Sequence, residues 1–245
     1  MAKKEILVVD DEIEIGELLT LYLSKSGFGV STATTGFEAL SLTSRVNPDL
    51  IILDINLPDI DGIELCQQLR QKTEVPIIFL SCKSDDMDII LGLTVGGDDY
   101  ITKPFSPGEL VARVKAHFRR DRIFSLKREQ HNEVLNFKGL SIDLSSHIVT
   151  VDGQLVKLPA KEFDLLVLLA SHPNVVFSID QIYDSIWGLD NIGDTRTVMV
   201  HISNLRRKIE QDPRRPKYIT TIKSVGYKFS AQQYENRQNQ IEAIF

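Results

Sequence analysis

The first half of the chain alternates short apolar runs with longer amphipathic segments. Strand-like stretches lie near residues 5–10, 28–33, 50–54, 76–80 and 99–102, and the runs ILVV, LIIL and PIIFL among them are continuous and rich in Ile and Val. Such runs are typical of strands buried on both faces of a parallel sheet. Between them lie segments such as residues 14–27, where Leu18, Leu19, Tyr22 and Leu23 share one helical face and Gly27 closes the end. The pattern predicts a doubly wound α/β domain with a five-stranded parallel sheet over residues 1–120.

The pattern changes after residue 120. Residues 121–133 are polar without long periodicity, which predicts an interdomain linker. Short strand-like runs follow, and the Asp152-Gly153 pair between two of them is a strong hairpin signal. Helical segments near 160–171, 179–187 and 195–211 precede a last pair of short strands. This order predicts an α+β domain over residues 134–230, and we expect the polar tail 231–245 to fray or stay disordered.

Composition restricts the class of protein. The chain has 245 residues, of which 42% are hydrophobic, enough for two ordinary domains. No apolar run approaches the roughly 18 to 20 residues of a membrane span, and the N-terminus is not a signal peptide, so we expect a cytoplasmic protein without a membrane partner. Cys66 and Cys82 show no metal-ligand spacing and are expected to be reduced and buried.

Charge is distributed unevenly along the chain. The net charge is −6, but residues 1–120 hold 12 basic against 19 acidic residues, whereas residues 121–245 hold 16 against 15. The overall balance therefore does not indicate nucleic acid, and any DNA-binding hypothesis must rest on local clustering.

Five polar residues lie at or near the ends of apolar segments in the first half: Asp10, Asp11, Asp54, Ser81 and Lys103. Ligands bind outside the carboxyl ends of parallel strands, so we expect these side chains to converge. Three carboxylates can hold Mg²⁺ or Mn²⁺ and still expose one nucleophile, while the amine and hydroxyl can serve an incoming phosphoryl group. Helix capping by acids after a strand would explain one such residue but not five.

The segment 194–211 carries the clearest pattern of the second half. Val198, Ile202, Leu205 and Ile209 form an apolar stripe at helical spacing, and Asp194 can cap the start. The residues off this stripe are mostly basic or polar: Arg196, Thr197, Val200, His201, Asn204, Arg206, Arg207 and Lys208. This mixture suits a helix in the DNA major groove, although a solvated charged face produces the same stripe.

The strings VVDDE, LIILDINLPDIDGIEL, PIIFLS and DDYITKPF resemble the CheY-like receiver domain of bacterial response regulators over residues 1–120. The resemblance implies that Asp54 accepts phosphate from a sensor histidine kinase. It implies a metal site made by Asp10, Asp11, Asp54 and the backbone carbonyl of Asn56. It further implies a switching hydroxyl at Ser81, a phosphate-contacting Lys103, a rotating Tyr100 and a cis Lys103–Pro104 bond.

Residues 134–230 resemble the winged-helix effector domain of the OmpR/PhoB subfamily, through KLPAKEFDLL, DTRTVMVHISNLRRKIE and YITTIKSVGYKF. The resemblance implies double-stranded promoter DNA as a ligand and a recognition helix near 195–211. By position, the base-edge candidates are Val200, Asn204 and Arg206, and the phosphate candidates are Arg196, Thr197, His201 and Lys208, with Lys223 in the wing. Trp187 and Phe163 are expected in the core, and the loop 187–194 is a candidate surface for RNA polymerase.

The sequence departs from the family pattern at three positions. Met199 stands where an acid is usual, Ser224 replaces a wing glycine, and Ile89 occupies a position where many members carry a lysine that pairs with Glu109. The resemblance implies a homodimer on activation through the surface at about 84–120. Asp98 and Arg113 remain available for a dimer salt bridge, and Ile89, if exposed, adds an apolar contact.

These observations favour a phosphorylation-controlled transcriptional regulator of a two-component system rather than an enzyme, with only self-limited phosphotransfer to Asp54 and autodephosphorylation. A phosphatase or phosphotransferase acting through an aspartyl phosphate is one alternative, but the second acid of a DxD motif is absent after Asp54. A phosphorylation-independent DNA binder that uses the first domain for dimerisation is another. Asn56 and Lys83, each two residues after a site residue, are hypothesised to set the lifetime of the acyl phosphate.

Overall fold

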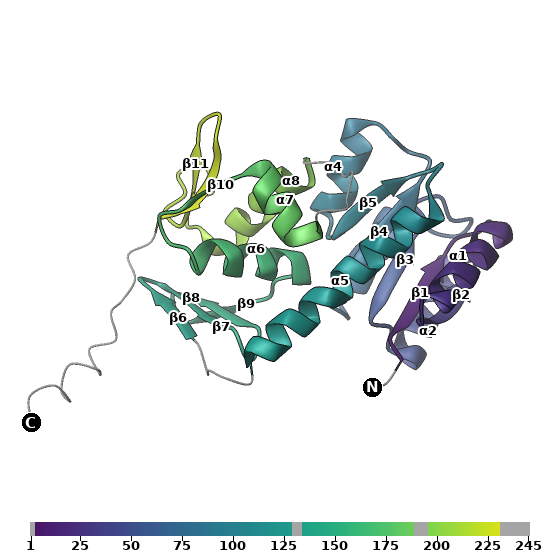
Figure 1. Ribbon diagram of the computed structural model, residues 1–245. Coiled ribbons are helices and arrows are strands. Elements are labelled where there is room, and N and C mark those ends of the chain that lie inside the picture. Colours follow the sequence, from purple (N-terminus) through teal and green to yellow (C-terminus); the bar gives the residue numbers. More distant parts are fainter. Residues whose placement is uncertain (1–2, 129–133, 189–195, 231–245) are drawn as a thin grey trace, which may run out of the picture.

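The computed structural model describes residues 3–128, 134–188 and 196–230, which form two domains in contact with each other (Figure 1). In the described part of the chain, no helix is long and apolar enough to cross a membrane.

The N-terminal domain is a five-stranded parallel sheet with helices on both faces, as predicted. The strand order is β2-β1-β3-β4-β5, with bounds Glu5–Val9 (β1), Gly29–Ala33 (β2), Leu50–Leu53 (β3), Ile77–Ser81 (β4) and Asp99–Thr102 (β5). The helices are Ile13–Lys25 (α1), Gly36–Val46 (α2), Gly62–Arg70 (α3), Asp86–Thr94 (α4) and Pro107–Arg128 (α5).

Alternate residues of each strand point to opposite faces of this sheet, and both faces are covered. Val8, Ile52 and Leu80 belong to one apolar cluster, together with residues of α1 and α5. Val9 and Leu53 belong to the other, together with residues of α2, α3 and α4. Burial on both faces explains why these strands are continuous apolar runs.

Three details differ from the sequence predictions. In α1, Leu19 and Leu23 are buried, but Leu18 and Tyr22 are 38% and 40% exposed, because only a narrow stripe of the helix meets the sheet. Helix α5 continues to Arg128, so residues 121–128 of the predicted linker are helical. Cys66 is buried as expected, whereas Cys82 is exposed in the loop after β4.

The C-terminal domain begins with an antiparallel sheet of Val134–Phe137 (β6), Leu140–Asp143 (β7), Ile148–Val151 (β8) and Gln154–Val156 (β9). The predicted hairpin turn joins β8 to β9, with positive φ at Asp152 (48°) and Gly153 (80°). Both values suit a type I′ turn.

Three helices and a second sheet complete this domain. The helices are Ala160–Ala170 (α6), Ile179–Trp187 (α7) and Arg196–Ile209 (α8), and the sheet has the order β10-β12-β11, with Val176–Ser178 (β10), Ile219–Ile222 (β11) and Gly226–Phe229 (β12). The sequence did not predict β10, whose three residues are too few for a periodic signal. Phe163, Trp187 and the stripe Val198, Ile202, Leu205 and Ile209 are buried in one core, as predicted. The tail 231–245 lies outside the described residues.

The contact between the domains involves α8 most of all. Helix α8 packs against α4, and α7 packs against α5 (Figure 1). The helix that the sequence assigns to DNA therefore lies at a domain interface.

Candidate functional site

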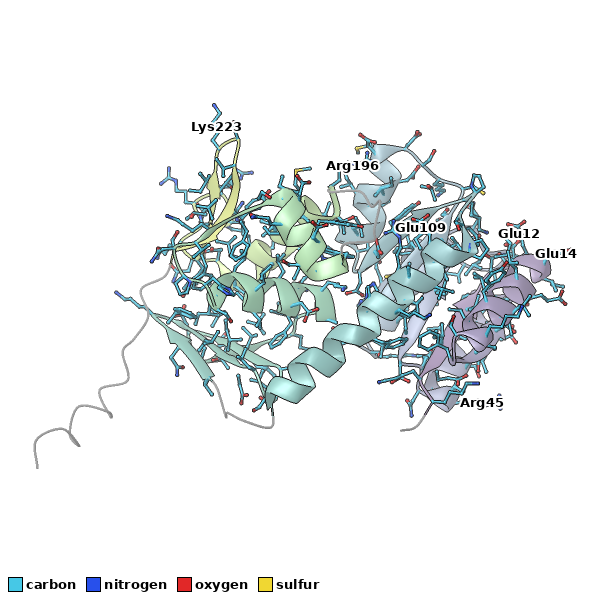
Figure 2. All side chains as sticks on the ribbon, viewed as in Figure 1. Glu12, Glu14, Arg45, Glu109, Arg196 and Lys223 are labelled. Carbon is cyan, nitrogen blue, oxygen red and sulfur yellow. The ribbon has the colours of Figure 1, made fainter. Side chains whose placement is uncertain are left out.

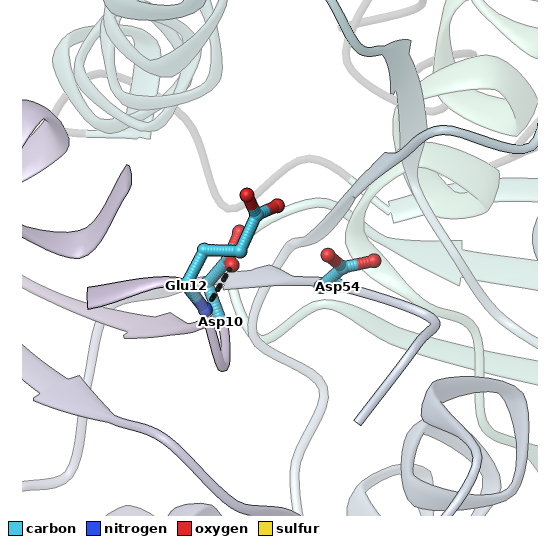
Figure 3. Close-up of side chains that lie close together, drawn as sticks. All are labelled: Asp10, Glu12 and Asp54. Carbon is cyan, nitrogen blue, oxygen red and sulfur yellow. Dashed lines mark hydrogen bonds between the residues drawn. The ribbon is translucent and has the colours of Figure 1, made fainter. Parts of the chain in front are cut away.

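The expected acidic pocket is present at the carboxyl edge of the parallel sheet. Asp10 follows β1, Asp54 follows β3 and Lys103 follows β5, and both aspartates are only 4% exposed. The Lys103 amine lies 2.9 Å from an Asp10 carboxylate oxygen, 2.7 Å from one of Asp54 and 3.0 Å from one of Glu12. Asp10, Glu12 and Asp54 face a common centre (Figure 3).

The charges of this pocket are tightly coupled. Burial raises the pKa of Asp10 above its ordinary value, although contacts with Lys103 and the Glu12 amide oppose that rise. Burial would lower the pKa of Lys103, but its hydrogen bonds to Asp54, Asp10 and Glu12 outweigh burial and raise it. Three carboxylates thus face a single ammonium, a balance that favours a further cation.

The residues present fit a hard divalent cation. Asp10, Glu12 and Asp54 each offer one carboxylate oxygen, and these oxygens lie within 4.8 Å of one another. Asp11, which the resemblance placed in the metal set, is exposed and outside this cluster. The Glu12 amide donates to Asp10 Oδ1 at 3.0 Å, a bond that turns the chain and directs Glu12 to the centre (Figure 3). Asn56 is exposed, and its backbone N–H donates to Asp54 Oδ1 at 3.1 Å.

A chain of contacts leads from this pocket to the face of α4 and β5. Ser81 is fully buried, and its hydroxyl accepts a hydrogen bond from the Lys83 amide at 3.2 Å. The Tyr100 hydroxyl donates to the Lys83 carbonyl at 2.8 Å, and burial raises the pKa of Tyr100 to about 12. The Tyr100 side chain is therefore turned inward. The Lys103–Pro104 bond is cis, as the resemblance implied.

Helix α8 presents a core stripe and two further faces. The core stripe packs into the C-terminal domain. A second face points to the N-terminal domain, and its members are buried: Thr197, Val200, His201 and Asn204. A third face is open to solvent and carries Met199, Ser203 and Arg207.

The buried face of α8 is held by hydrogen bonds to the N-terminal domain. The Asn204 amide donates to the Leu93 carbonyl at 3.2 Å and to the Thr94 carbonyl at 3.4 Å. Val200 belongs to the apolar cluster of α4 and β5 that also contains Ile89 and Tyr100. Two of the three base-edge candidates, Val200 and Asn204, are thus covered by the receiver-like domain.

Arg196 was expected to contact DNA phosphate. In this structure its guanidinium pairs with the carboxylate of Asp86 at the start of α4. Lys208 pairs with the buried carboxylate of Glu162 at 2.8 Å. Lys223 is exposed at the tip of the β11–β12 hairpin, where a wing residue should lie (Figure 2). Ser224 beside it has a φ of 61°.

Arg206, the third base-edge candidate, is hydrogen-bonded to strand β11. Its guanidinium donates to the Ile219 carbonyl at 2.7 and 2.9 Å and to the Thr221 hydroxyl at 2.9 Å, and it lies over the Tyr227 ring. Arg206 therefore braces α8 against β11 in this structure. Ser203 and Arg207, which lie on the exposed face of α8, were not among the expected DNA contacts. Their helical offset from the core stripe was the signal that could have found them.

Known proteins share this architecture. The family model for the response regulator receiver domain matches residues 6–115, and the model for the C-terminal domain of transcriptional regulatory proteins matches residues 153–229. The chain is 42% identical over 226 residues to the DNA-binding response regulator MtrA of Mycolicibacterium paratuberculosis, covering 92% of this chain and 98% of MtrA. It is 46% identical over 231 residues to the alkaline phosphatase synthesis transcriptional regulatory protein PhoP of Bacillus subtilis, covering 92% and 96%. The solved structure of a RitR mutant covers 94% of this chain and 100% of its own, with a TM-score of 0.77 and 27% identity.

The chain belongs to the OmpR/PhoB family of response regulators. It is a DNA-binding regulator of a two-component system, in which a receiver domain is joined to a winged-helix domain. Membership implies a sensor kinase and DNA as partners. Neither the turnover enzyme nor the phosphorylation-independent binder is favoured by these matches.

The receiver surface expected to dimerise is occupied in this response regulator. Asp98 is fully buried and pairs with Arg70 at 2.6 Å in this closed arrangement. Arg113 instead pairs with Asp99 at 3.0 Å and Glu109 at 2.9 Å within its own chain. Ile89 is 5% exposed and packs at the domain interface, so the exposure on which its apolar dimer contact depends is absent in this closed arrangement.

Trp187 was expected only in the core of the winged-helix domain. It is buried there, but its indole N–H also donates to the Asp98 carbonyl of the receiver at 3.0 Å. Arg113 reaches the Tyr183 hydroxyl of α7 at 3.4 Å. The expected Asp194 cap and most of the loop 187–194 lie outside the described residues.

Proposed function

We propose that phosphorylation of Asp54 controls the access of α8 to DNA. Asp54 accepts a phosphoryl group from a phosphohistidine of the sensor kinase. A carboxylate oxygen of Asp54 forms the new bond to phosphorus, while the bond from phosphorus to the histidine nitrogen breaks and leaves its electron pair on that nitrogen. The reaction is self-limited, because hydrolysis of the same aspartyl phosphate returns the protein to its starting state.

The pocket residues have defined parts in this transfer. Lys103, 2.7 Å from Asp54, is placed to neutralise charge on the phosphoryl oxygens. Asp10, Asp54 and Glu12 or Asp11, with the Asn56 carbonyl, would hold Mg²⁺ or Mn²⁺, which supplies further neutralisation. The hydroxyl of Ser81 is the group expected to reorient towards the phosphate.

The response travels through Lys83 to the domain interface. A shift of Ser81 moves the Lys83 backbone, to which both Ser81 and Tyr100 are hydrogen-bonded. Tyr100 shares its apolar cluster with Val200 of α8. Displacing Lys83 therefore disturbs the packing beneath the recognition helix, and a bias of a few kcal/mol suffices to shift a two-state equilibrium.

Groups of the receiver bind the side chains of α8 that would otherwise contact DNA. The carboxylate of Asp86 takes the place of a backbone phosphate opposite Arg196. The carbonyls of Leu93 and Thr94 accept from Asn204 as a base edge would. Helix α4 is thus an internal competitor of DNA for the same side chains.

Opening this interface also frees the surface for dimerisation. The face of α4, β5 and α5 covered by the C-terminal domain includes Ile89, Asp98 and Arg113. A two-fold pair of receivers through this face would place two winged-helix domains on tandem half-sites about 10 bp apart. The loop 187–194 is the proposed contact for RNA polymerase, and we place the protein in the cytoplasm, where kinase and promoter are found together.

The burial of Val200 and Asn204 against the receiver is the observation that carries this proposal. The test is a gel shift on a duplex selected from a random library, with and without beryllofluoride. We expect beryllofluoride to raise the affinity for this duplex by roughly 5- to 150-fold in the wild type and to leave it unchanged in Asp54→Ala. Equal affinities with and without beryllofluoride would instead favour a phosphorylation-independent binder.

A further inference from the structure

His201 lies at the centre of the closed domain interface. Its side chain belongs to α8 and is 2% exposed, and its Nε2 lies 3.3 Å from the Asp98 carbonyl of the receiver. Its ring lies 5.4 Å from that of Trp187, which donates to the same carbonyl. One receiver carbonyl therefore anchors two side chains of the C-terminal domain.

The hydrogen bonds of His201 suit a neutral imidazole alone. Nε2 must carry a proton in order to donate to the Asp98 carbonyl, so Nδ1 of the neutral ring carries only a lone pair. Among the residues that the structure describes, Nδ1 has no hydrogen-bond partner. A second proton would create a buried N–H without an acceptor, which is costly.

The charged groups around His201 do not compensate this cost. Asp98, just before β5, and Asp99, its first residue, favour the protonated ring, but each carboxylate is already paired, with Arg70 of α3 and Arg113 of α5. On α6, the buried ammonium of Lys161 opposes it. Burial is the largest effect and lowers the pKa of His201 to about 4.

Separation of the domains would remove this penalty. An exposed imidazole has an ordinary pKa of about 6.5, so the open form takes up a proton in a range where the closed form does not. The closed form is therefore fully favoured above about pH 6.5, and its advantage is lost as the pH falls towards about 4.

We propose that His201 is an acid-sensitive latch, whose protonation opens the interface and frees α8 without phosphorylation of Asp54. The proton comes from solvent and is bound at Nδ1 once the interface has opened. Between about pH 7.5 and about pH 5.5, linkage through this one group raises the ratio of open to closed protein about tenfold. The inference rests on the closed arrangement in the proposed function but not on the phosphorylation step.

The test uses the full chain carrying Asp54→Ala, so that phosphorylation plays no part. Affinity for the selected DNA duplex is measured at both pH values in this background and with His201→Gln added. Glutamine can still donate to the Asp98 carbonyl but does not titrate. We expect an affinity gain of about tenfold on acidification with His201 and a loss of that gain with glutamine.

A protonated His201 could also attract DNA directly, so an open reference is needed. Ile89→Lys restores the residue common in the family and places an ammonium against Val200. Trp187 is the only tryptophan, so acrylamide quenching of its fluorescence checks beforehand that this variant is open. If the variant is still closed, Asp86→Lys is added and the check is repeated. The latch predicts that Ile89→Lys gains much less affinity on acidification than its parent.

Equal gains in the closed and open proteins would overturn the latch, as would an undiminished gain in His201→Gln. The beryllofluoride response of the wild type, measured separately, reports on the proposed function. Failure of one can therefore be distinguished from failure of the other.

Discussion

The pocket around Asp54 and the helix α8 both consist of polar side chains on regular elements, yet they differ in what surrounds them. The pocket is built within one sheet, and Asp10, Asp54 and Lys103 come together because neighbouring parallel strands end at the same edge. The face of α8 that carries Val200, His201 and Asn204 is covered by another domain. The first site is thus assembled within the receiver, whereas the second is assembled on a helix that the receiver covers in this structure.

This difference shows how the protein separates input from output. The pocket residues Asp10, Asp54 and Lys103 all belong to the receiver, so we expect phosphorylation to need no rearrangement of the domains. Arg196 and Asn204 are bonded to α4, so under the proposed function α4 must leave the recognition helix before that helix meets DNA. The proposal thus places a control step between the two sites, and variants of either site test it.

Removal of Lys103 should have the largest effect on the input site. Lys103→Ala leaves three carboxylates without their shared ammonium, and phosphorylation of Asp54 by phosphoramidate should slow by roughly 100- to 1000-fold. A phosphate-affinity gel measures the rate. Lys115→Ala, which removes an exposed lysine of α5, is the matched control and should react at the wild-type rate. Equal rates in both variants would remove Lys103 from the chemistry.

Arg70 tests how far the interface depends on Asp98. Arg70→Ala leaves the buried Asp98 carboxylate without its ion-pair partner and should lower the free energy of unfolding by about 3 kcal/mol or more. Urea titrations followed by circular dichroism measure this loss. Lys4→Ala breaks the solvent-exposed pair with Asp49 and should cost less than about 1 kcal/mol. A loss for Arg70→Ala no greater than that for Lys4→Ala would show that Asp98 is not a structural anchor.

Adjacent arginines of α8 should behave differently. Arg207 is exposed on the outward face, so Arg207→Ala should weaken DNA binding by about 1–3 kcal/mol in fluorescence anisotropy with the selected duplex. Arg206 braces β11, so Arg206→Ala should lower the melting temperature of the C-terminal domain without altering the preferred bases. The reverse pattern, with altered base preference in Arg206→Ala alone, would restore Arg206 as a reader.

The lifetime of the phosphorylated state should depend on Asn56 and Lys83. Exchange of either for leucine should lengthen the aspartyl-phosphate half-life several-fold, because an apolar side chain near Asp54 or Ser81 hinders water from reaching phosphorus. Decay of the phosphorylated band over time measures it. An unchanged half-life in both variants would end this hypothesis.

The wing turn should show the smallest effect. Ser224 has a φ of 61°, a left-handed conformation that glycine adopts without a steric cost. Ser224→Gly should raise the free energy of unfolding by up to about 1 kcal/mol, whereas Ser44→Gly within α2 should lower it by about 0.5 kcal/mol. Destabilisation by Ser224→Gly would show that the turn does not strain its serine.

Local pattern predicted most of the elements and most of the pocket. Continuous Ile and Val runs predicted β1, β3 and β4, because burial on both faces leaves a clear signal. The stripe from Val198 to Ile209 predicted the core face of α8 for the same reason. Glu12 was missed in the pocket because the turn after β1 decides which acid points inward.

The interface could not be predicted in this way. Whether Val200 and Asn204 meet DNA or the receiver depends on the relative placement of two domains, and the same polar side chains suit either partner. The structure pairs Arg206 with the Ile219 carbonyl and Asp98 with Arg70, partners that the sequence pattern alone does not select. Helical periodicity identifies the outward face of α8 but not what covers it.

Acrylamide quenching of Trp187, with and without beryllofluoride, tests the central claim most directly. This tryptophan is 1% exposed and bonded to the Asp98 carbonyl across the interface. If phosphorylation releases α8, quenching should increase with beryllofluoride in the wild type and remain constant in Asp54→Ala. A rise in DNA affinity with beryllofluoride while Trp187 stays equally protected would contradict the account.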